Sequence, residues 1–286
     1  MEIFKKSILD LLSSKNSLSV AVHDGLFHSD DVFCVALLRK LAKECCFELK
    51  LYRTREPQIL SAVDMRVDVG GRYFEESLDF DHHQKDDALM QTEGVKHAAI
   101  GLLCKWCMTP EFYQIFKEQY LLGLEYQDNN GKSHPKYSSI GFWVQPMLPA
   151  FGEELNINEA FEDTVKIAEV ILERCLKTVE GLLKAEEELP NLINESIAGG
   201  KILILKKRVP ILQQLHPELA FTILCMDTGY SFLGVNGHLL PPHLRGLRGE
   251  QIAQKCGYEG VFTHPGGFTG TMCTLEGAKE ICVRSL

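Results

Sequence analysis

The chain has 286 residues, of which 45% are hydrophobic and 24% are charged, and its formal net charge is −9. This composition excludes an intrinsically disordered, collagen-like or low-complexity chain, and the length favours two domains. No run of 18 apolar residues occurs, so we expect no transmembrane helix and no membrane partner. The negative charge also excludes a surface that binds nucleic acid by bulk electrostatics, although bound divalent cations would cancel part of that charge locally.

The N-terminal segment and the cysteines predict a cytoplasmic protein. Residues 1–14 indicate a short amphipathic helix that contains Glu2 and Asp10, unlike a secretory signal or a transit peptide. The 10 cysteines are scattered, which favours reduced thiols. Cys104 and Cys107 form one CxxC pair. A redox role is one interpretation of this pair, and packing within an apolar helix is the interpretation that we favour.

In the first half of the chain, short apolar strands alternate with helices. Strands are predicted at residues 18–23, 47–52, 65–69 and 78–81. Apolar residues at helical spacing predict a helix over residues 30–43, with Ser29 as its N-cap. The alternation predicts an α/β domain that contains a parallel sheet with helices on both faces.

The second half of the chain predicts a long helix followed by a smaller unit. Residues 97–127 are mostly helical in pattern, and the turn formers of residues 128–158 predict an irregular stretch with functional loops. A long amphipathic helix is expected over residues 159–188, ending before Pro190. The elements expected beyond it are strands at 201–205, 220–226, 231–235 and 260–264 and helices at 249–256 and from 275. We therefore expect a domain of residues 1–188, which ends in the long linking helix, and a C-terminal α+β domain of residues 196–286.

Histidines and aspartates follow the predicted strands of the first half. The set comprises His23, His28, Asp30, Asp31, Asp68, Asp81, His82, His83 and Asp128. A lone His or Asp at a strand end is commonly a turn former, and Asp128 precedes an Asn-Asn-Gly turn signal. Several consecutive strand ends, however, would bring these side chains to one edge of a parallel sheet. Mixed imidazole and carboxylate ligands suit manganese, iron, cobalt or zinc. Two such ions sharing a carboxylate would support phosphoester hydrolysis.

The motifs HDGLFHSDD, RTREP, RVDVGG, DFDHHQ, EYQDNNG, RGLRGE and FTHPGGFTG occur in this order. This ordered set resembles the melanocyte-proliferating-gene-one (MYG-one) family of exonucleases. That family belongs to the DHH phosphoesterase superfamily, with RecJ-type nucleases and family II pyrophosphatases. The resemblance runs from about His23 to the C-terminal helix. The chain departs from the family pattern at Glu125, where many members have Asp, and at Asn130, which resembles an inserted residue.

The resemblance implies a two-domain, metal-dependent phosphoesterase with two divalent ions, most commonly Mn²⁺, with Mg²⁺, Co²⁺ or Zn²⁺ as alternatives. His23 and His28 would bind the first ion. Asp30, His82 and Asp128 would bind the second ion. Asp68 would bridge the two ions, and His83 would hold the substrate phosphate or the attacking water, so Asp68 and His83 are the implied catalytic residues. Asp81 would orient a histidine, and Asp31 would support its loop.

The resemblance also implies that the second domain closes the cleft and contacts the substrate. His264 would face the substrate, and Arg245 and Arg248 would anchor phosphate. Gly266 and Gly267 would let backbone N–H groups approach an anion. A surface turn explains these arginines and glycines almost equally well. Arg53 and Arg55 match the family, and either substrate contact or a solvated strand end accounts for them.

Three functions follow from these patterns. The first is a metal-dependent phosphodiesterase, implied by the resemblance to be a 3′–5′ exonuclease acting on RNA or short single-stranded nucleic acid. The second is a hydrolase of a small phosphate substrate, such as pyrophosphate, phosphoadenosine phosphate or a cyclic dinucleotide. The third is a non-catalytic metal-binding protein. The sequence leaves the resident metal, the cleavage polarity and the oligomeric state open.

Overall fold

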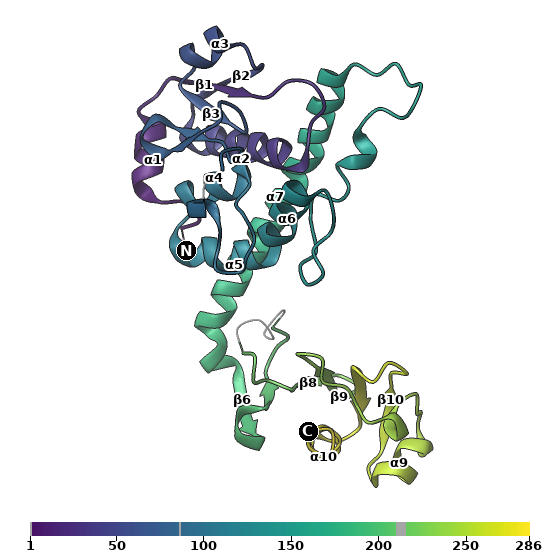
Figure 1. The fold of residues 1–286 in the computed structure, drawn as a ribbon. Helices are drawn as coiled ribbons and strands as arrows, with labels where there is room; N and C mark the ends of the chain where they lie inside the picture. The colour runs from purple at the N-terminus through teal and green to yellow at the C-terminus, as the bar shows by residue number, and fades with distance from the viewer. Residues whose placement is uncertain (1, 86, 210–215) are drawn as a thin grey trace. The chain divides into compact units, whose positions relative to one another are not determined.

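The computed structural model describes residues 2–85, 87–209 and 216–286. The chain divides into two compact units, Met1–Glu180 and Gly181–Leu286. Figure 1 shows the ribbon, with most helices and several strands labelled. The long helix α7 (Ile157–Leu192) belongs partly to each unit.

The first unit is built on a mainly parallel sheet with strand order β2-β1-β3-β5-β4. The strands are β1 (Ser17–Val22), β2 (Glu48–Arg53), β3 (Met65–Val67), β4 (Tyr73–Phe74) and β5 (Asp79–Phe80). Strand β1 pairs in parallel with β2 and β3, β3 pairs in parallel with β5, and β4 is an antiparallel edge. Besides short 3-10 turns, the helices of this unit are α1 (Lys6–Ser13), α2 (Ser29–Cys45), α3 (Pro57–Ala62), α4 (Ala99–Cys107), α5 (Pro110–Phe116), the π-helix η3 (Lys117–Leu121), α6 (Leu122–Asn130) and the first part of α7.

Helices cover both faces of this sheet. Neighbouring residues of a strand point to opposite faces. On one face, Val67 pairs with Phe80, whose ring lies 5.3 Å from that of Trp106 in α4. On the other face, Arg66 donates hydrogen bonds to the carbonyls at the end of α3, including that of Leu60 at 2.7 Å. The predicted α/β class, with a parallel sheet covered by helices on both faces, is confirmed.

Two local predictions for this unit need correction. The N-cap of α2 is His28, and Ser29 is the first helical residue. The backbone N–H of His28 donates to the Asp31 carboxylate at 2.9 Å, which is half of a capping box. The short elements α3 and β4 were not anticipated. Helix α3 has 6 residues, too few for a helical repeat of apolar positions, and β4 is a 2-residue edge that pairs only with β5.

The second unit contains a sheet with strand order β10-β11-β9-β8-β7-β6. Its strands are β6 (Ile193–Ile197), β7 (Ile202–Leu205), β8 (Phe221–Met226), β9 (Gly229–Gly234), β10 (Gly260–Thr263) and β11 (Thr269–Met272). Helices α9 (Glu250–Cys256) and α10 (Leu275–Val283) accompany this sheet, and their residues Ile252 and Ile281 pack into its core. The unit is α+β, as predicted.

The predicted end of the long helix was wrong. Helix α7 runs from Ile157 to Leu192 and contains Pro190, and β6 begins at the next residue. Proline in the last turn removes only one helical N–H donor, so the helix continues past it for two residues.

Candidate metal centre

The candidate ligands sit where strands of the first unit end. His23 follows β1 and Asp68 follows β3, while Asp81, His82 and His83 follow β5. His28 caps helix α2, and Asp30 lies in the first turn of that helix. Since β1, β3 and β5 are parallel neighbours, their carboxyl ends meet at one edge of the sheet.

Asp128 reaches this edge from a helix. The turn signal around Asp128 predicted an irregular stretch, but α6 continues to Asn130 and ends at Gly131, whose φ is +66°. Gly131 provides the left-handed C-cap that the sequence signal indicates, and the helix ends three residues later than expected.

Three overlapping groups of ligand atoms result. The groups are His23–His28–Asp68, Asp68–His82–His83 and Asp30–His82–Asp128, and the ligand atoms of each group lie within 4.8 Å of one another. All six predicted metal ligands belong to these groups, and His83 joins them. The structure therefore brings the predicted ligands together, with Asp68 and His82 each common to two groups.

Asp68 lies at the centre of this arrangement. One carboxylate oxygen is 3.2 Å from Nε2 of His23, and the other is 3.3 Å from Nε2 of His82. The backbone of Asp68 is left-handed, with φ +53°, which few residues other than glycine adopt. Such strain gathers at functional sites, where the surrounding structure enforces it. Here it turns a buried carboxylate between the two histidines.

The second shared ligand, His82, faces two further carboxylates. Its Nε2 atom is 3.5 Å from an oxygen of Asp30 and 3.3 Å from an oxygen of Asp128. The same oxygen of Asp30 accepts a hydrogen bond from the backbone N–H of Ala99 at 2.9 Å. The fully buried Asp30 is thereby fixed by the first residue of α4.

Burial and mutual repulsion shift the pKa values of the cluster. Burial raises the pKa of Asp31 to about 7. Burial and the neighbouring carboxylates of Asp68 and Asp128 raise the pKa of Asp30. Burial alone would lower the pKa of His23, but Asp68 and Asp31 outweigh it and raise that pKa to about 9. Keeping these acids ionised together in one buried site requires positive charge nearby, and divalent cations would provide it.

Buried atoms without hydrogen-bond partners give a second indication of a cation. Among the described residues, His23 Nε2, Asp30 Oδ1, Asp31 Oδ2 and Asp68 Oδ1 are buried and accept or donate no hydrogen bond. Leaving such atoms unsatisfied is costly. Imidazole nitrogens and carboxylate oxygens are ligands of Mn²⁺, Fe²⁺, Co²⁺ and Zn²⁺. The donor set therefore fits bound divalent metal.

Residues behind the ligands hold them in place. Asp31 accepts hydrogen bonds from the backbone N–H groups of His28 and Val32, at 2.9 and 2.8 Å, and so supports the loop before α2. Asp81 accepts a hydrogen bond from the backbone N–H of Gly71 at 2.6 Å, and its other oxygen is 2.6 Å from Nδ1 of His83. These contacts are those expected for a loop support and for a carboxylate that orients a histidine.

Sequence reasoning missed Asn129 and Lys96. The Asn129 amide oxygen is 3.3 Å from Nδ1 of His82, and the Lys96 ammonium donates a 2.6 Å hydrogen bond to the carbonyl of His82. Asn129 was interpreted only as a turn residue. Its position directly after Asp128 was the one available signal. Lys96 lies far from the ligand motifs along the chain and offered no signal.

The arginines of RTREP stabilise the loop after β1. Arg53 donates 2.7 Å hydrogen bonds to the carbonyl of Gly25 and to Asn158, and its guanidinium lies over the ring of Phe161. Arg55 pairs with the side chain of Asp24.

The CxxC cysteines lie in α4 as buried free thiols, and burial raises the pKa of both. A redox cysteine needs an exposed thiol of lowered pKa, so packing is the better interpretation of this pair.

The residues predicted to contact substrate in the second unit cluster among themselves. The ring of His264 lies 4.3 Å from that of Phe268, and the Nδ1 atom of His264 accepts a hydrogen bond from the Gly266 N–H at 3.0 Å. A Cβ atom on Gly267, whose φ is +77°, would lie 2.6 Å from Nε of Arg245, so the guanidinium packs directly on this glycine. Arg245 donates a 2.6 Å hydrogen bond to the Leu240 carbonyl.

Arg248 precedes α9 and is exposed. Its backbone N–H donates a 3.1 Å hydrogen bond to the side chain of Gln251. The structure thus holds Arg245 against the glycine turn, whereas Arg248 is at the surface of the second unit.

A parallel sheet with histidines and aspartates gathered at the carboxyl ends of its strands defines an α/β protein with a candidate metal centre. The model of the MYG1 exonuclease family, described as "Uncharacterised protein family (UPF0160)", matches residues 19–108 and 122–286. The chain belongs to this family, and the predicted resemblance is confirmed.

Relatives in several organisms match most of the chain. The MYG1 protein of Schizosaccharomyces pombe is 25% identical, over 95% of this chain and 98% of its own length. The MYG1 exonuclease of Mus musculus is 25% identical, over 93% of this chain and 84% of its own length. The match to the crystal structure of exonuclease RecJ bound to manganese covers 98% of this chain and 95% of the RecJ chain, with 16% identity. Its TM-score of 0.31 is too low to define a shared fold. No helix among the described residues has the length and apolar character needed to cross a membrane.

Proposed function

We propose that this protein is a metal-dependent phosphodiesterase that removes nucleotides from an end of RNA or short single-stranded nucleic acid. The observation that carries the proposal is the set of three ligand groups that share Asp68 and His82. Shared ligands suit two neighbouring ions, and Mn²⁺ is the ion that we propose from among those that the donor set suits. The names of the mammalian relatives, which are exonucleases, support a nucleic acid substrate.

Bound divalent ions would activate a water molecule and stabilise negative charge on the phosphate oxygens. His23, His28 and Asp68 would hold one ion, and Asp30, His82 and Asp128 would complete the second site with Asp68. Asp68 has the central position that a bridging carboxylate needs, since its two oxygens face different histidines.

His83 is proposed to contact the substrate phosphate or the attacking water. Its side chain is 61% exposed, whereas that of His82 is 6% exposed. The hydrogen bond with Asp81 raises the pKa of His83, because the carboxylate stabilises the imidazolium. A charged or hydrogen-bonding imidazole at the mouth of the site would bind a phosphate oxygen.

The proposed C-terminal domain of residues 196–286, which lies within the second unit, is proposed to bind the substrate through His264, Arg245 and Arg248. The glycine turn of Gly266 and Gly267 is proposed to present backbone N–H groups to a phosphate. Arg53 and Arg55 are assigned no substrate contact, since both already hold the loop after β1. The proposed direction of cleavage is 3′–5′.

The experiment compares wild type with Asp68→Asn on bis-p-nitrophenyl phosphate and on a short RNA labelled at one end. Each reaction is run with Mn²⁺ and with chelator. The expected result is Mn²⁺-dependent release of mononucleotides that Asp68→Asn lacks. Asp163→Asn, which changes an exposed aspartate of α7, is the matched control and should retain full activity.

Other outcomes change the proposal in defined ways. Diester turnover without RNA degradation would reject RNA and favour a small nucleotide substrate. Absence of turnover on both substrates, with Mn²⁺ bound, would contradict the enzymatic function and favour a metal-binding role through protein contacts. Labelling each RNA end in turn gives the polarity, because only an enzyme acting from the 3′ end releases the 3′ label at once.

A further inference from the structure

Two cavities of different character meet at the candidate metal centre. The first has a volume of about 230 Å³ and is lined by His28, His82, His83, Lys96, Asp128 and Asn129. The second has a volume of about 290 Å³, and its lining includes Phe27, Ser29, Gln127, Val144, Gln145 and Leu148. His28 and Asp128 line both cavities. A ligand bound at the shared wall can therefore extend into both.

The smaller cavity suits a phosphate. Its lining combines metal-ligand candidates with the Lys96 ammonium, which donates hydrogen bonds to the carbonyls of His82 and Gln84 at 2.6 and 3.0 Å. With divalent cations bound, positive charge would face an anion placed there.

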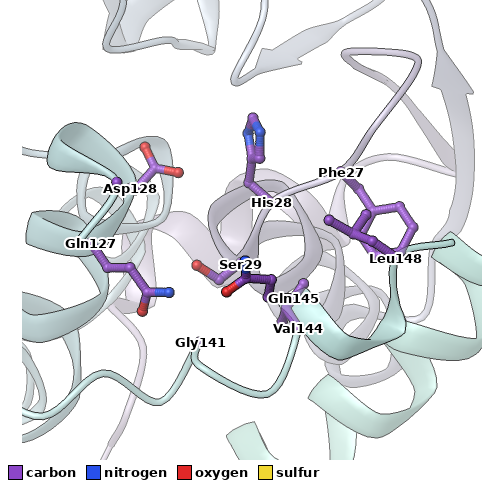
Figure 2. Close-up of a pocket in the computed structure, with 10 residues that line it drawn as sticks. Phe27, His28, Ser29, Gln127, Asp128, Gly141, Val144, Gln145 and Leu148 are labelled. Atoms are coloured by element: carbon purple, nitrogen blue, oxygen red, sulfur yellow. The ribbon is translucent and has the colours of Figure 1, made fainter. Parts of the chain in front are cut away.

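The larger cavity suits an uncharged group with one apolar face and polar edges. Apart from the shared His28 and Asp128, its lining residues carry no charge. Figure 2 shows Phe27 and Leu148 together on one side, Gln127 and Asp128 on the opposite side, and His28 between them. Phe27 and Val144 are buried, and Leu148 is the partly exposed apolar side chain of the lining. The amides of Gln127 and Gln145 both donate and accept hydrogen bonds. The volume of this cavity is at the lower end of the range for small-molecule sites, so the cavity has room for one small organic group.

The wall of the larger cavity is held by close packing. A Cβ atom on Gly141 would lie 2.3 Å from Cβ of Ser29, so the backbone of the loop at Gly141 packs directly on the start of α2. The next residues are tied down as well, since the ring of Trp143 lies 6.1 Å from that of Phe33 in α2, edge to face. Phe27 packs in the same way against Phe161 of α7, at 5.7 Å. These contacts fix the segments that line the cavity.

We infer that the larger cavity binds the nucleoside of the nucleotide whose phosphate is cleaved, a step that rests on the proposed phosphodiesterase function. A base has apolar faces, one of which would pack on the partly exposed Leu148, and its edges match side-chain amides. Amides can rotate between donor and acceptor, so the cavity accepts different bases. Pyrophosphate has no group for this cavity, so the first unit selects nucleotide esters over inorganic pyrophosphate.

The test measures kcat/KM of the Mn²⁺-loaded full chain on three esters that release the same p-nitrophenolate. These are methyl p-nitrophenyl phosphate and the 5′- and 3′-(p-nitrophenyl phosphate) esters of thymidine. We expect one thymidine ester to exceed the methyl ester by about tenfold or more, because only the thymidine esters fill the cavity. A ratio near one in wild type would overturn the inference.

Variants locate that preference. Leu148→Trp fills the cavity and should bring the ratio of the better thymidine ester to the methyl ester close to one. Gln145→Ala removes an exposed amide without adding volume and should lower the ratio about threefold. Gln58→Ala, which removes an exposed amide on α3, is the matched control and should keep the wild-type ratio. An unchanged ratio in both pocket variants would place the preference elsewhere and overturn the inference.

A binding measurement separates this inference from the proposed function. Calorimetry compares thymidine 5′-monophosphate with methyl phosphate on the Mn²⁺-loaded protein, without turnover. Tighter binding of the nucleotide by about tenfold, lost in Leu148→Trp, would support the cavity even if no ester were hydrolysed. Equal binding together with hydrolysis of all three esters would leave the phosphodiesterase function and reject the nucleoside site.

Discussion

The side-chain amide of Asn129 fixes the orientation of His82. Its nitrogen donates hydrogen bonds to the backbone carbonyls of Glu125 and Lys96, at 2.8 and 3.0 Å. These two acceptors determine which end of the amide is nitrogen, so the oxygen must face Nδ1 of His82, at 3.3 Å. An oxygen there accepts a hydrogen bond from the Nδ1–H group of His82 and leaves Nε2 free to bind metal.

Asn129→Ala should therefore weaken Mn²⁺ binding by about tenfold or more, as loss of a ligand's supporting hydrogen bond does in other metal sites. The measurement is calorimetric titration with Mn²⁺. Asn130→Ala is the matched control, since Asn130 makes a similar bond to a helix carbonyl, at 2.9 Å to Tyr126. Long-range ¹H–¹⁵N spectra of labelled histidine in the Zn²⁺ form should show the Nδ1–H tautomer of His82 in wild type and loss of that signature in Asn129→Ala. Equal affinities and spectra in the two variants would contradict the positioning role.

Metal affinity should rise with pH. In the metal-free protein the pKa of His23 is raised to about 9 and that of Asp31 to about 7, so His23 carries a proton at neutral pH. A metal ion that binds His23 displaces that proton. The free-energy cost of removing the proton falls as the pH rises toward the pKa of His23. Calorimetry in buffers of different ionisation enthalpy should show proton release on Mn²⁺ binding and tighter binding at about pH 8.5 than at about pH 6.5. An affinity independent of pH would show that His23 is already unprotonated.

Asp79→Asn should destabilise the first unit by about 1.5–3 kcal/mol, because the buried carboxylate of Asp79 pairs with Arg66 and accepts a 2.5 Å hydrogen bond from Ser77. Burial would raise the pKa of Asp79, but Ser77 and Arg66 outweigh it and lower the pKa. Because the pKa of Asp79 is lower in the folded chain than the unfolded value of about 3.9, the ionised carboxylate stabilises the fold at any pH above that unfolded value. This stabilisation is lost as the pH falls through the pKa of the folded state. Urea unfolding should show the full difference at about pH 6 and a smaller one below about pH 4. A difference that persists undiminished in acid would exclude the charge as its cause.

Substitution by alanine at two helical glycines, Gly101 and Gly181, should change the stability of the protein in opposite directions. A Cβ atom on Gly101 would lie 1.7 Å from the Glu125 carboxylate, which is buried beside His97. Gly101→Ala should therefore destabilise by about 1–3 kcal/mol through overpacking. A Cβ atom on Gly181 in α7 would meet nothing within 4 Å, so Gly181→Ala should stabilise by about 0.5–1 kcal/mol. Thermal unfolding of both variants measures the signs, and destabilisation by Gly181→Ala would contradict a regular helix at that position.

The sequence by itself determined the class of the fold and the identities of the candidate ligands. Both follow from short-range patterns, since strands alternate with helices and His or Asp follows β1, β3 and β5. Parallel strands force their carboxyl ends to one edge. His23, Asp68 and His82 could therefore be predicted as neighbours without any knowledge of the packing.

Only the tertiary structure decided the residues behind the ligands and the shape of the site. Asn129 and Lys96 act on His82 from segments more than ten residues away, and no local pattern records such a contact. The continuation of α6 through Asp128 and of α7 through Pro190 likewise depended on packing that local turn signals do not include. Gly141 and Ser29, which both line the larger cavity, pack directly on each other, and such a close approach between distant segments becomes visible only when the chain is folded.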